Sequence, residues 1–184
     1  MAVRADAECL PVPTTLLFYV KAKVPTTFEI VPAQNTRLLE QAKLLFKEYA
    51  AWLGIDLSFQ HFEEELANLP AGYMPPEGCL LLATVGEQAA GCVAVRKLED
   101  DVCEMKRLYV KPQFRGMKIG KVLAEAAIEE AKRLEYNLMR LDTLPSMVEA
   151  QKLYLSLGFK KIAPYRFNPV EGTVYMELNL SPVS

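Results

Sequence analysis

Two glycines and several basic side chains follow an apolar segment near the middle of the 184-residue chain, and their types and spacing suit phosphate binding. The set consists of Arg115, Gly116, Lys118, Gly120 and Lys121. From residue 119 onward apolar residues recur at helical spacing, so a helix is expected to begin beside the glycines. The first amide groups of a helix lack intrahelical partners and carry partial positive charge. Together these features predict a cradle for a phosphate group, and a pyrophosphate would suit it.

A plainer interpretation is that the glycines serve only a turn between a strand and a helix, because a glycine pattern alone is a weak signal. Two observations favour the cradle. Residues 102–110 are apolar enough to form a strand, and Pro112 cannot donate to a strand ladder, so the strand must end directly before the glycines. The cationic side chains then add the positive charge that a phosphate needs.

The composition indicates a globular protein with one sizeable core, because 51% of the residues are hydrophobic. The net charge of -2 gives no basic surplus, so no nucleic acid is expected as a partner. Cys9, Cys79, Cys92 and Cys103 form no CxxC pair and no cluster with histidine, so we expect no metal site. Their apolar surroundings suit the reduced thiols of a cytoplasmic protein. No apolar run approaches the ~20 residues that span a bilayer, so no membrane association is expected.

Hydrophobic periodicity divides the chain into an N-terminal extension, residues 1–26, with a short strand at 16–20, and one domain, residues 27–184. Asn35 or Thr36 suits the start of the first helix, and Asn137 suits the left-handed end of the longest one. The elements expected in the domain are a strand at 27–32, helices at 36–53 and 58–69, strands at 79–85, 89–96 and 102–110, a helix at 119–136, a strand at 138–143, a helix at 147–157, and strands at 159–167 and 173–180.

This order of elements predicts an α+β fold, layered αβα, with a mixed and mostly antiparallel central sheet of about seven strands flanked by about four helices. The three strands between 79 and 110 follow one another through short turns, which is typical of an antiparallel meander. The strand at 138–143 comes after a helix, so we expect it to lie parallel to the strand at 102–110.

Two motifs in this order resemble the GNAT superfamily of N-acetyltransferases: Gln113-Phe114-Arg115-Gly116 after a strand, and Leu153-Tyr154-Leu155-Ser156-Leu157-Gly158-Phe159 after the next helix and strand. The resemblance covers about residues 27–180. It implies that acetyl-coenzyme A is the co-substrate, that backbone amides of the first motif bind its pyrophosphate, and that the preceding strand end bonds its pantetheine arm. The cofactor-binding residues it implies are Leu108, Tyr109, Val110, Gln113, Phe114, Arg115, Gly116, Met117, Lys118, Ile119 and Gly120.

Two positions depart from the family pattern. Lys118 stands where the first motif usually has a second glycine or alanine, so its side chain must point away from the cofactor or onto a phosphate. Met147 stands where the second motif often has an asparagine, which removes one expected hydrogen bond to the cofactor.

Acetyl transfer to an amine needs a neutral amine and a proton for the departing sulfur. Tyr154, in the second motif, is the expected acid, because the family often uses this tyrosine to protonate the thiolate. The alternative is that Tyr154 has only a structural role, on the face of its helix that packs against the core. Glu104 is the candidate base, since some family members carry a basic glutamate at the matching position. It could instead pair with Lys106 or Arg107 on a solvated sheet face, and a water chain could replace it.

The resemblance places the acceptor site between the first two helices and the late strands. The candidate acceptor-binding residues are Trp52, Tyr73, Tyr165 and Arg166, with Tyr49 and Phe59 as further wall candidates. Arg166 could hold the carboxylate of an amino-acid-like substrate. His61 is the only histidine and is expected on a solvated helix face.

The sequence therefore predicts a cytoplasmic N-acetyltransferase that moves an acetyl group from acetyl-coenzyme A directly to the amine of a small molecule or a protein. The alternative is a non-catalytic acyl-coenzyme A-binding sensor with the same fold. A dinucleotide site is disfavoured because a full GxGxxG motif and serial parallel βαβ units are missing. A homodimer is plausible from the closing strands, and the acceptor is not specified, because acceptor choice depends on loops.

Overall fold

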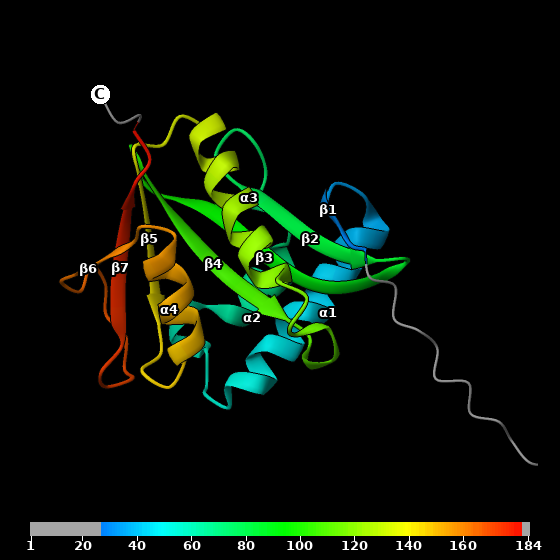
Figure 1. Cartoon of the computed structure of the whole chain (residues 1–184), viewed down its shortest axis with the longest axis horizontal. Helices are drawn as coiled ribbons and strands as arrows, with labels where there is room; N and C mark the ends of the chain where they lie inside the picture. Colours follow the sequence, from blue (N-terminus) through cyan, green and yellow to red (C-terminus); the bar gives the residue numbers. More distant parts are fainter. Residues whose placement is uncertain (1–26, 182–184) are drawn as a thin grey trace, which may run out of the picture.

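The computed structural model describes residues 27–181, which form one seven-stranded sheet with helices on both faces (Figure 1). The predicted extension, with its strand at 16–20, lies outside the described residues. The elements in chain order are β1 (Glu29–Pro32), α1 (Thr36–Leu53), the 3-10 helix η1 (Ser58–Gln60), α2 (Phe62–Asn68), β2 (Cys79–Val85), β3 (Gln88–Glu99), β4 (Val102–Val110), the 3-10 helix η2 (Pro112–Phe114), α3 (Ile119–Arg133), β5 (Leu138–Thr143), α4 (Val148–Ser156), β6 (Lys160–Ile162) and β7 (Val174–Asn179).

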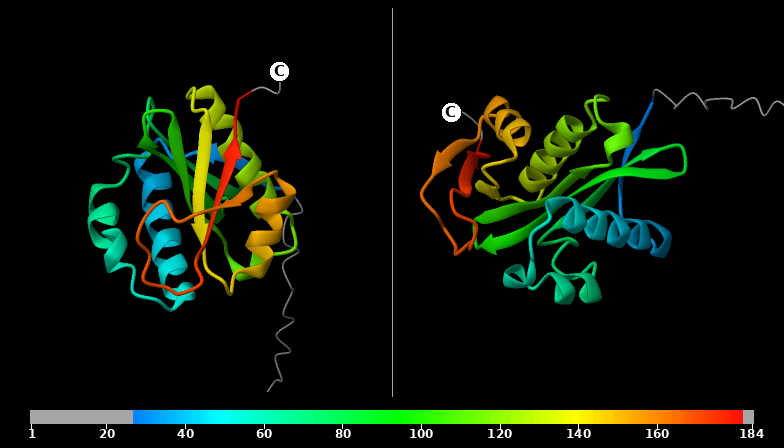
Figure 2. Two further views of the ribbon diagram at one scale, coloured as in Figure 1. Left: turned by 90° about the vertical axis from the view of Figure 1, so that its left-hand side faces the viewer. Right: turned by 90° about the horizontal axis from the view of Figure 1, so that it is seen from below.

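The sheet has the strand order β1-β2-β3-β4-β5-β7-β6. Strands β2 to β4 form the antiparallel meander, and β5 lies parallel to β4, both as predicted. β1 adds to the edge of the meander, antiparallel to β2. α1 and α2 cover one face of the sheet, and α3 and α4 cover the other (Figure 2). One hydrophobic core lies on each face, with Phe46 and Leu66 in the first and Leu123 and Phe159 in the second. The predicted α+β class with a mixed, mostly antiparallel sheet is confirmed.

Three local predictions are wrong, and each has a hydrogen-bonding or pairing reason. The helix expected at 58–69 is broken, because Asp56 accepts the amide of Ser58 at 2.8 Å and starts a 3-10 turn that ends at His61 in the left-handed conformation. Glu135 closes α3 instead of Asn137, whose amide donates to the Asp101 carbonyl at 2.9 Å.

The strand expected at 159–167 is the third difference, because only Lys160–Ile162 pairs with β7. The chain then leaves the sheet and returns to it at Val174. This excursion, residues 163–173, brings Arg166 and Asn168 to the end of β5, where both bond to Asp142. It therefore supplies part of the site described below.

β4 and β5 separate after a short paired stretch. They pair only where Val102, Cys103 and Glu104 face residues 138–140, and β5 continues alone beside β7. On its other side β4 carries a bulge between residues 106 and 109, where Arg107 has a φ of 57°. A bulge of this kind increases local twist and bends the strand. The C-terminal half of β4 therefore has one edge open toward β5.

Gly91 on β3 allows close packing beside this bulge. It faces Val110, and a Cβ atom added to it would lie 2.5 Å from the Tyr109 carbonyl oxygen. We expect Gly91→Ala to lower the free energy of unfolding by about 1–3 kcal/mol, because the backbone of β4 must shift. Urea unfolding measures this loss. Gly120→Ala is the control, since its Cβ would meet only Val110 Cγ2 at 3.6 Å; equal stabilities of the two variants would contradict the prediction.

Candidate active site

The turn from β4 into α3 presents a run of unbonded amides. After η2, Gly116 has a φ of 89° and Lys118 a φ of 62°, and α3 begins without a side-chain cap. Among residues 27–181, no hydrogen-bond acceptor engages the amide groups of residues 116–120. Five successive unpaired donors at a helix N-terminus, with the positive end of the helix dipole behind them, are suited to binding an anion, and residues 116–120 are here called the candidate anion site, or anion site. The strand, turn and helix expected here are all present.

The space in front of Gly116 is open, and the neighbouring Arg115 side chain contacts the strand end and α1. A Cβ atom on Gly116 would meet nothing within 4 Å. Arg115 donates from Nε to the Val110 carbonyl at 3.3 Å, and its guanidinium lies 4.9 Å from the ring centre of Trp52. Trp52, expected in the acceptor wall, thus lies beside the anion site. Lys118, at the position where the motif usually has glycine or alanine, adopts a left-handed backbone.

The open edge of β4 directs backbone groups into the space between β4 and β5. The amide of Lys111 donates to the Ala90 carbonyl at 2.9 Å, so it faces β3. Amides alternate in direction along a strand, so those of Leu108 and Val110 face the opposite, open side. This edge leads from the anion site toward the separation of the two strands.

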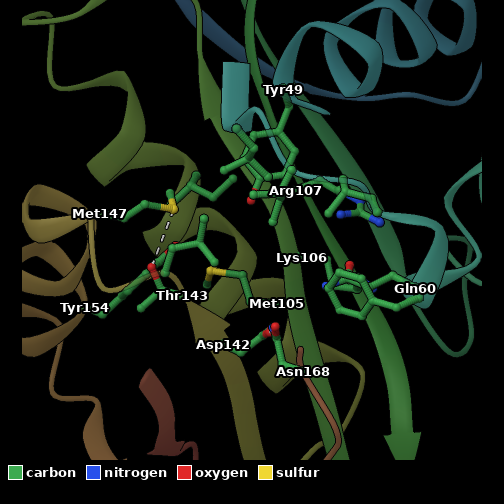
Figure 3. Close-up of a pocket in the computed structure, with 16 residues that line it drawn as sticks. Tyr49, Gln60, Met105, Lys106, Arg107, Asp142, Thr143, Met147, Tyr154 and Asn168 are labelled. Atoms are coloured by element: carbon green, nitrogen blue, oxygen red, sulfur yellow. Dashed lines mark hydrogen bonds between the residues drawn. The ribbon is translucent and has the colours of Figure 1, made fainter. Parts of the chain in front are cut away.

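A cavity of about 50 Å³, here called the gap cavity, occupies that separation. It is lined by residues 105–108 of β4, 142–144 of β5 and the following turn, parts of α1 and η1, and Met147, Tyr154 and Asn168. Figure 3 shows Tyr154 and Met147 on one side of β4 and Gln60 and Lys106 on the other. The Thr143 hydroxyl lies 3.7 Å from the Met147 sulfur, so Met147, where the family often has asparagine, contacts this wall.

Tyr154 reaches the gap cavity from α4. Its side chain is 6% exposed and its ring centre lies 5.7 Å from that of Phe159. Burial raises the pKa of the Tyr154 phenol above its ordinary value, so the hydroxyl keeps its proton at neutral pH. The arrangement suits a proton donor that also packs against the core.

Glu104 is fully buried and surrounded by donors. One oxygen accepts from Arg96 Nε at 3.0 Å, and the other accepts from Tyr165 at 2.9 Å and from Arg166 Nη1 at 2.7 Å. The alternative of a solvated pair with Lys106 does not occur. Its role as a base remains a prediction, and that role would require one of these bonds to open.

Asp142, which was not among the residues selected from the sequence, extends this network. Arg166 Nη2 donates to one of its oxygens, and Asn168 Nδ2 donates to the other at 2.8 Å. Arg166, expected to hold a substrate carboxylate, therefore bridges two carboxylates of the protein. An acidic residue at the end of an apolar strand was the available signal for Asp142.

Arg107 and Glu65 form a second buried pair. Arg107 turns at the bulge toward α2 and donates from Nε to Glu65 at 3.0 Å and from Nη2 to its second oxygen at 2.5 Å. The Tyr73 hydroxyl donates to the same carboxylate at 2.6 Å. Tyr73, expected in the acceptor wall, is 2% exposed and uses its hydroxyl here.

A second cavity of about 440 Å³, here called the outer cavity, lies between η1, α2, the middle of β4 at Lys106, Arg96 of β3 and the 163–173 excursion. It is lined by Phe59, Gln60, His61, Glu64, Glu65, Asn68, Ala71, Gly72, Tyr73, Arg96, Lys106, Arg166 and Phe167. Of these, Phe59, Gln60 and Lys106 also line the gap cavity, so the two cavities share one wall.

Lys106 is the charged residue in that shared wall. It is 6% exposed, and its Nζ atom has no hydrogen-bond partner among residues 27–181. Burial, followed by the charge of Arg107, lowers the pKa of Lys106 to about 7. Lys106 stands in β4 between Glu104 and Arg107, so the sequence alone did not distinguish it from these neighbouring charged residues.

Two further structural findings concern metal-binding clusters and membrane-spanning helices. Within residues 27–181, no cluster of three or more histidine, cysteine, aspartate or glutamate side chains is arranged to hold a metal ion. No helix in the described part of the chain combines the length and the apolar character needed to cross a bilayer.

A family model and several known proteins are similar to this chain in sequence. The sequence model of the acetyltransferase (GNAT) family matches residues 40–159. An uncharacterized N-acetyltransferase of Schizosaccharomyces pombe is 42% identical over 159 residues, which cover 85% of this chain and 98% of that protein. The N-acetylaspartate synthetase of Danio rerio is 38% identical over 100 residues, which cover 53% of this chain and 36% of that protein.

A solved structure from Salmonella typhimurium, an acetyltransferase with its cofactor acetyl-CoA, has a TM-score of 0.65 with this chain. It is 18% identical, and the match covers 85% of this chain and 96% of that one. At this identity the likeness bears on the fold, and the two folds agree.

Proposed function

The chain belongs to the acetyltransferase (GNAT) family and is an N-acetyltransferase, and we propose that it moves the acetyl group of acetyl-coenzyme A directly to the amine of a small molecule or a protein. The observation that carries this proposal is one continuous path: the unpaired amides of residues 116–120, the open edge of β4 and the gap cavity that contains Tyr154.

The residues along this path fit acetyl-coenzyme A from end to end. The amides of residues 116–120 would receive the pyrophosphate, with Arg115 and Lys118 supplying positive charge nearby. The outward-facing amides of Leu108 and Val110 would bond the pantetheine arm in the manner of an added strand. When bound, the co-substrate supplies an activated acetyl group as a thioester.

Within the gap cavity the protein would contribute a polarising amide and an acid. A backbone amide near Val110 would stabilise negative charge on the thioester carbonyl oxygen. As the new nitrogen–carbon bond forms and the carbon–sulfur bond breaks, Tyr154 would give its proton to the departing sulfur and regain one from solvent. No cysteine among the described residues lies at this cavity, which supports transfer without a covalent enzyme intermediate.

We propose that Glu104 acts mainly by fixing Arg96 and Arg166, because its oxygens already accept hydrogen bonds from three side chains. A water chain would then remove the proton from the acceptor amine. The sensor alternative is not favoured, because the two relatives whose match to this chain extends over most of their own length are named N-acetyltransferases. Relatives named N-acetylaspartate synthetase support an amine of a small molecule as the acceptor. A cytoplasmic location and a homodimer remain predictions.

Titration calorimetry with acetyl-coenzyme A tests the proposal. We expect the wild-type protein to bind it and Gly116→Ala to bind it roughly tenfold more weakly, because a Cβ atom strains the left-handed backbone at φ 89° by about 1–2 kcal/mol and the amides turn away as the loop relaxes. Gly86→Ala is the matched control, with a φ of 59° and open space around its Cβ but a place in the β2–β3 turn. Failure of the wild-type protein to bind acetyl-coenzyme A would reject the proposed function.

A further inference from the structure

The charged side chains between the two cavities do not balance. Lys106, Arg107 and Glu104 are buried, and the others are partly exposed. The whole set comprises four cations and three carboxylates: Arg96, Lys106, Arg107, Arg166, Glu65, Glu104 and Asp142. Each carboxylate is paired with at least one of the arginines. Lys106 has no partner in the described part of the chain, so the cluster has one positive charge more than it needs. A buried cation without a partner is costly and sheds its proton unless an anion arrives.

Unpaired polar atoms gather at the same place. Residues 27–181 contain four buried side-chain nitrogen or oxygen atoms without a hydrogen-bond partner. Three of them belong to residues that line the outer cavity: Nζ of Lys106, Nε of Arg166 and Oε1 of Gln60. Two are donors and one is an acceptor. Buried polar groups are nearly always paired in a folded protein, so this concentration indicates a missing polar ligand.

Neighbouring groups cannot supply that ligand from within the protein. Glu65 is occupied by Arg107 and Tyr73, and Glu104 is occupied by Arg96, Tyr165 and Arg166. The remaining carboxylate at the outer cavity, Glu64, is 71% exposed and lies 3.8 Å from His61. The lowered pKa of Lys106 agrees with a site that lacks its anion.

We propose that the outer cavity is the acceptor site and that it takes a free amino acid, whose carboxylate binds Lys106 Nζ and Arg166 Nε and whose amine donates to Gln60 Oε1. This proposal rests on the proposed function and names its substrate class. Gln60 and Lys106 also line the gap cavity, so an amine held at Gln60 lies at the boundary with the space where the thioester would be (Figure 3). A cavity of about 440 Å³ has room for an amino acid.

The expected role of Arg166 changes accordingly. Its two terminal nitrogens are held by Glu104 and Asp142, so only Nε is available to a ligand. Lys106 therefore becomes the main carboxylate anchor. Arg166 becomes a second donor whose position is fixed by two carboxylates.

The test compares acceptors that differ only in the α-carboxylate, after a screen of the twenty amino acids by coenzyme A release. The pairs are alanine and ethylamine, phenylalanine and phenethylamine, tryptophan and tryptamine, and aspartate and β-alanine. For the wild-type enzyme we expect kcat/KM to favour the carboxylate-bearing member of the accepted pair roughly 10- to 100-fold. Lys106→Met should reduce that preference to a few-fold at most, chiefly by raising KM.

Two further variants separate the anchor from a general effect on activity. Gln60→Leu should lower kcat/KM for both members of a pair by the same factor, because both carry the amine. Lys97→Met on β3 is the matched control: it removes an exposed lysine paired with Asp100 and should leave the preference unchanged. Lys106→Met should fold, since methionine has a similar length and removes an unpaired buried charge.

Equal kcat/KM for both members in the wild-type enzyme would overturn the inference, and so would an equal loss for both members in Lys106→Met. Acetyl-coenzyme A binding with no amino acid acetylated, or with only amines lacking a carboxylate acetylated, would overturn it while the proposed function stands. Absence of acetyl-coenzyme A binding would instead reject the proposed function, and this inference with it.

Discussion

Replacement of Tyr154 by phenylalanine is expected to lower kcat for acetyl transfer about 100- to 1000-fold, which lies in the lower part of the range for loss of a positioned general acid. Acetyl-coenzyme A affinity should stay within about twofold, because the phenol lies in the gap cavity and the anion site lies at the start of α3. The ring keeps its contact with Phe159, so the fold should be retained. Steady-state kinetics and calorimetry measure the two quantities on one preparation.

Tyr136→Phe is the matched control for this substitution. Tyr136 is also a buried tyrosine of the same core, but its hydroxyl donates to the Glu77 carbonyl at 2.8 Å, away from both cavities. Its loss should cost stability and leave kcat unchanged. A Tyr154→Phe enzyme with near wild-type kcat would show that the sulfur is protonated by another group, and a loss of cofactor affinity equal to the loss of kcat would show a binding role.

Segments with an unbroken local signal could be predicted closely from the sequence. The strands β2, β4 and β5 have the expected bounds, because each is a short segment that is rich in apolar residues and is closed by polar or turn-forming residues. The turn from β4 into α3 could also be predicted, since the end of the strand, Pro112, the two glycines and the start of the helix are close together in the sequence. The helix start accounts for the unpaired amides of Ile119 and Gly120, and the turn before it adds those of residues 116–118.

Features set by hydrogen bonds that helix periodicity does not reveal could not be predicted in this way. The break at His61 depends on Asp56 taking the Ser58 amide, and the left-handed Glu135 depends on Asn137 bonding to Asp101. Propensity favours a continuous helix in the first case and an asparagine in the second. Both preferences are smaller than the hydrogen bonds that oppose them.

The site shows the same limit more clearly. Alternation places Glu104 and Lys106 on one face of β4, which suggested a pair between them. The bulge turns Arg107 away toward α2, and the strand order brings Arg96 from β3 and Arg166 from the 163–173 excursion to Glu104. Lys106 was left unpaired by this competition, and only the full arrangement of charges reveals it.

Glu65→Ala is expected to lower the free energy of unfolding by about 3–5 kcal/mol at pH 7, the usual cost of removing one partner from a buried ion pair. The Arg107 side chain is 3% exposed, so the guanidinium would remain buried without a carboxylate. Tyr73 would lose its acceptor at the same time. Urea unfolding measures the change, and Glu149→Ala, which breaks the exposed pair with Lys152, should cost less than about 0.5 kcal/mol.

Acid unfolding gives this prediction its second arm. Burial raises the pKa of Glu65, but the hydrogen bonds and charge of Arg107 outweigh burial, and the pKa is lower than its ordinary value. A carboxyl that binds its proton more weakly in the folded state stabilises the fold above its unfolded pKa of about 4.3 and loses that contribution as pH falls through the folded pKa. The difference in free energy of unfolding between the wild-type protein and Glu65→Ala should therefore become smaller below about pH 4.

A double variant distinguishes the cost of an unpaired guanidinium from the cost of the backbone conformation at the bulge. If the cost of Glu65→Ala comes from an unpaired guanidinium, removing that guanidinium as well, in Glu65→Ala with Arg107→Leu, should recover part of the loss. Full recovery is not expected, because leucine must adopt the φ of 57° that Arg107 holds at the bulge. A double variant whose loss of stability equals the sum of the losses in the two single variants would show that the two side chains act independently.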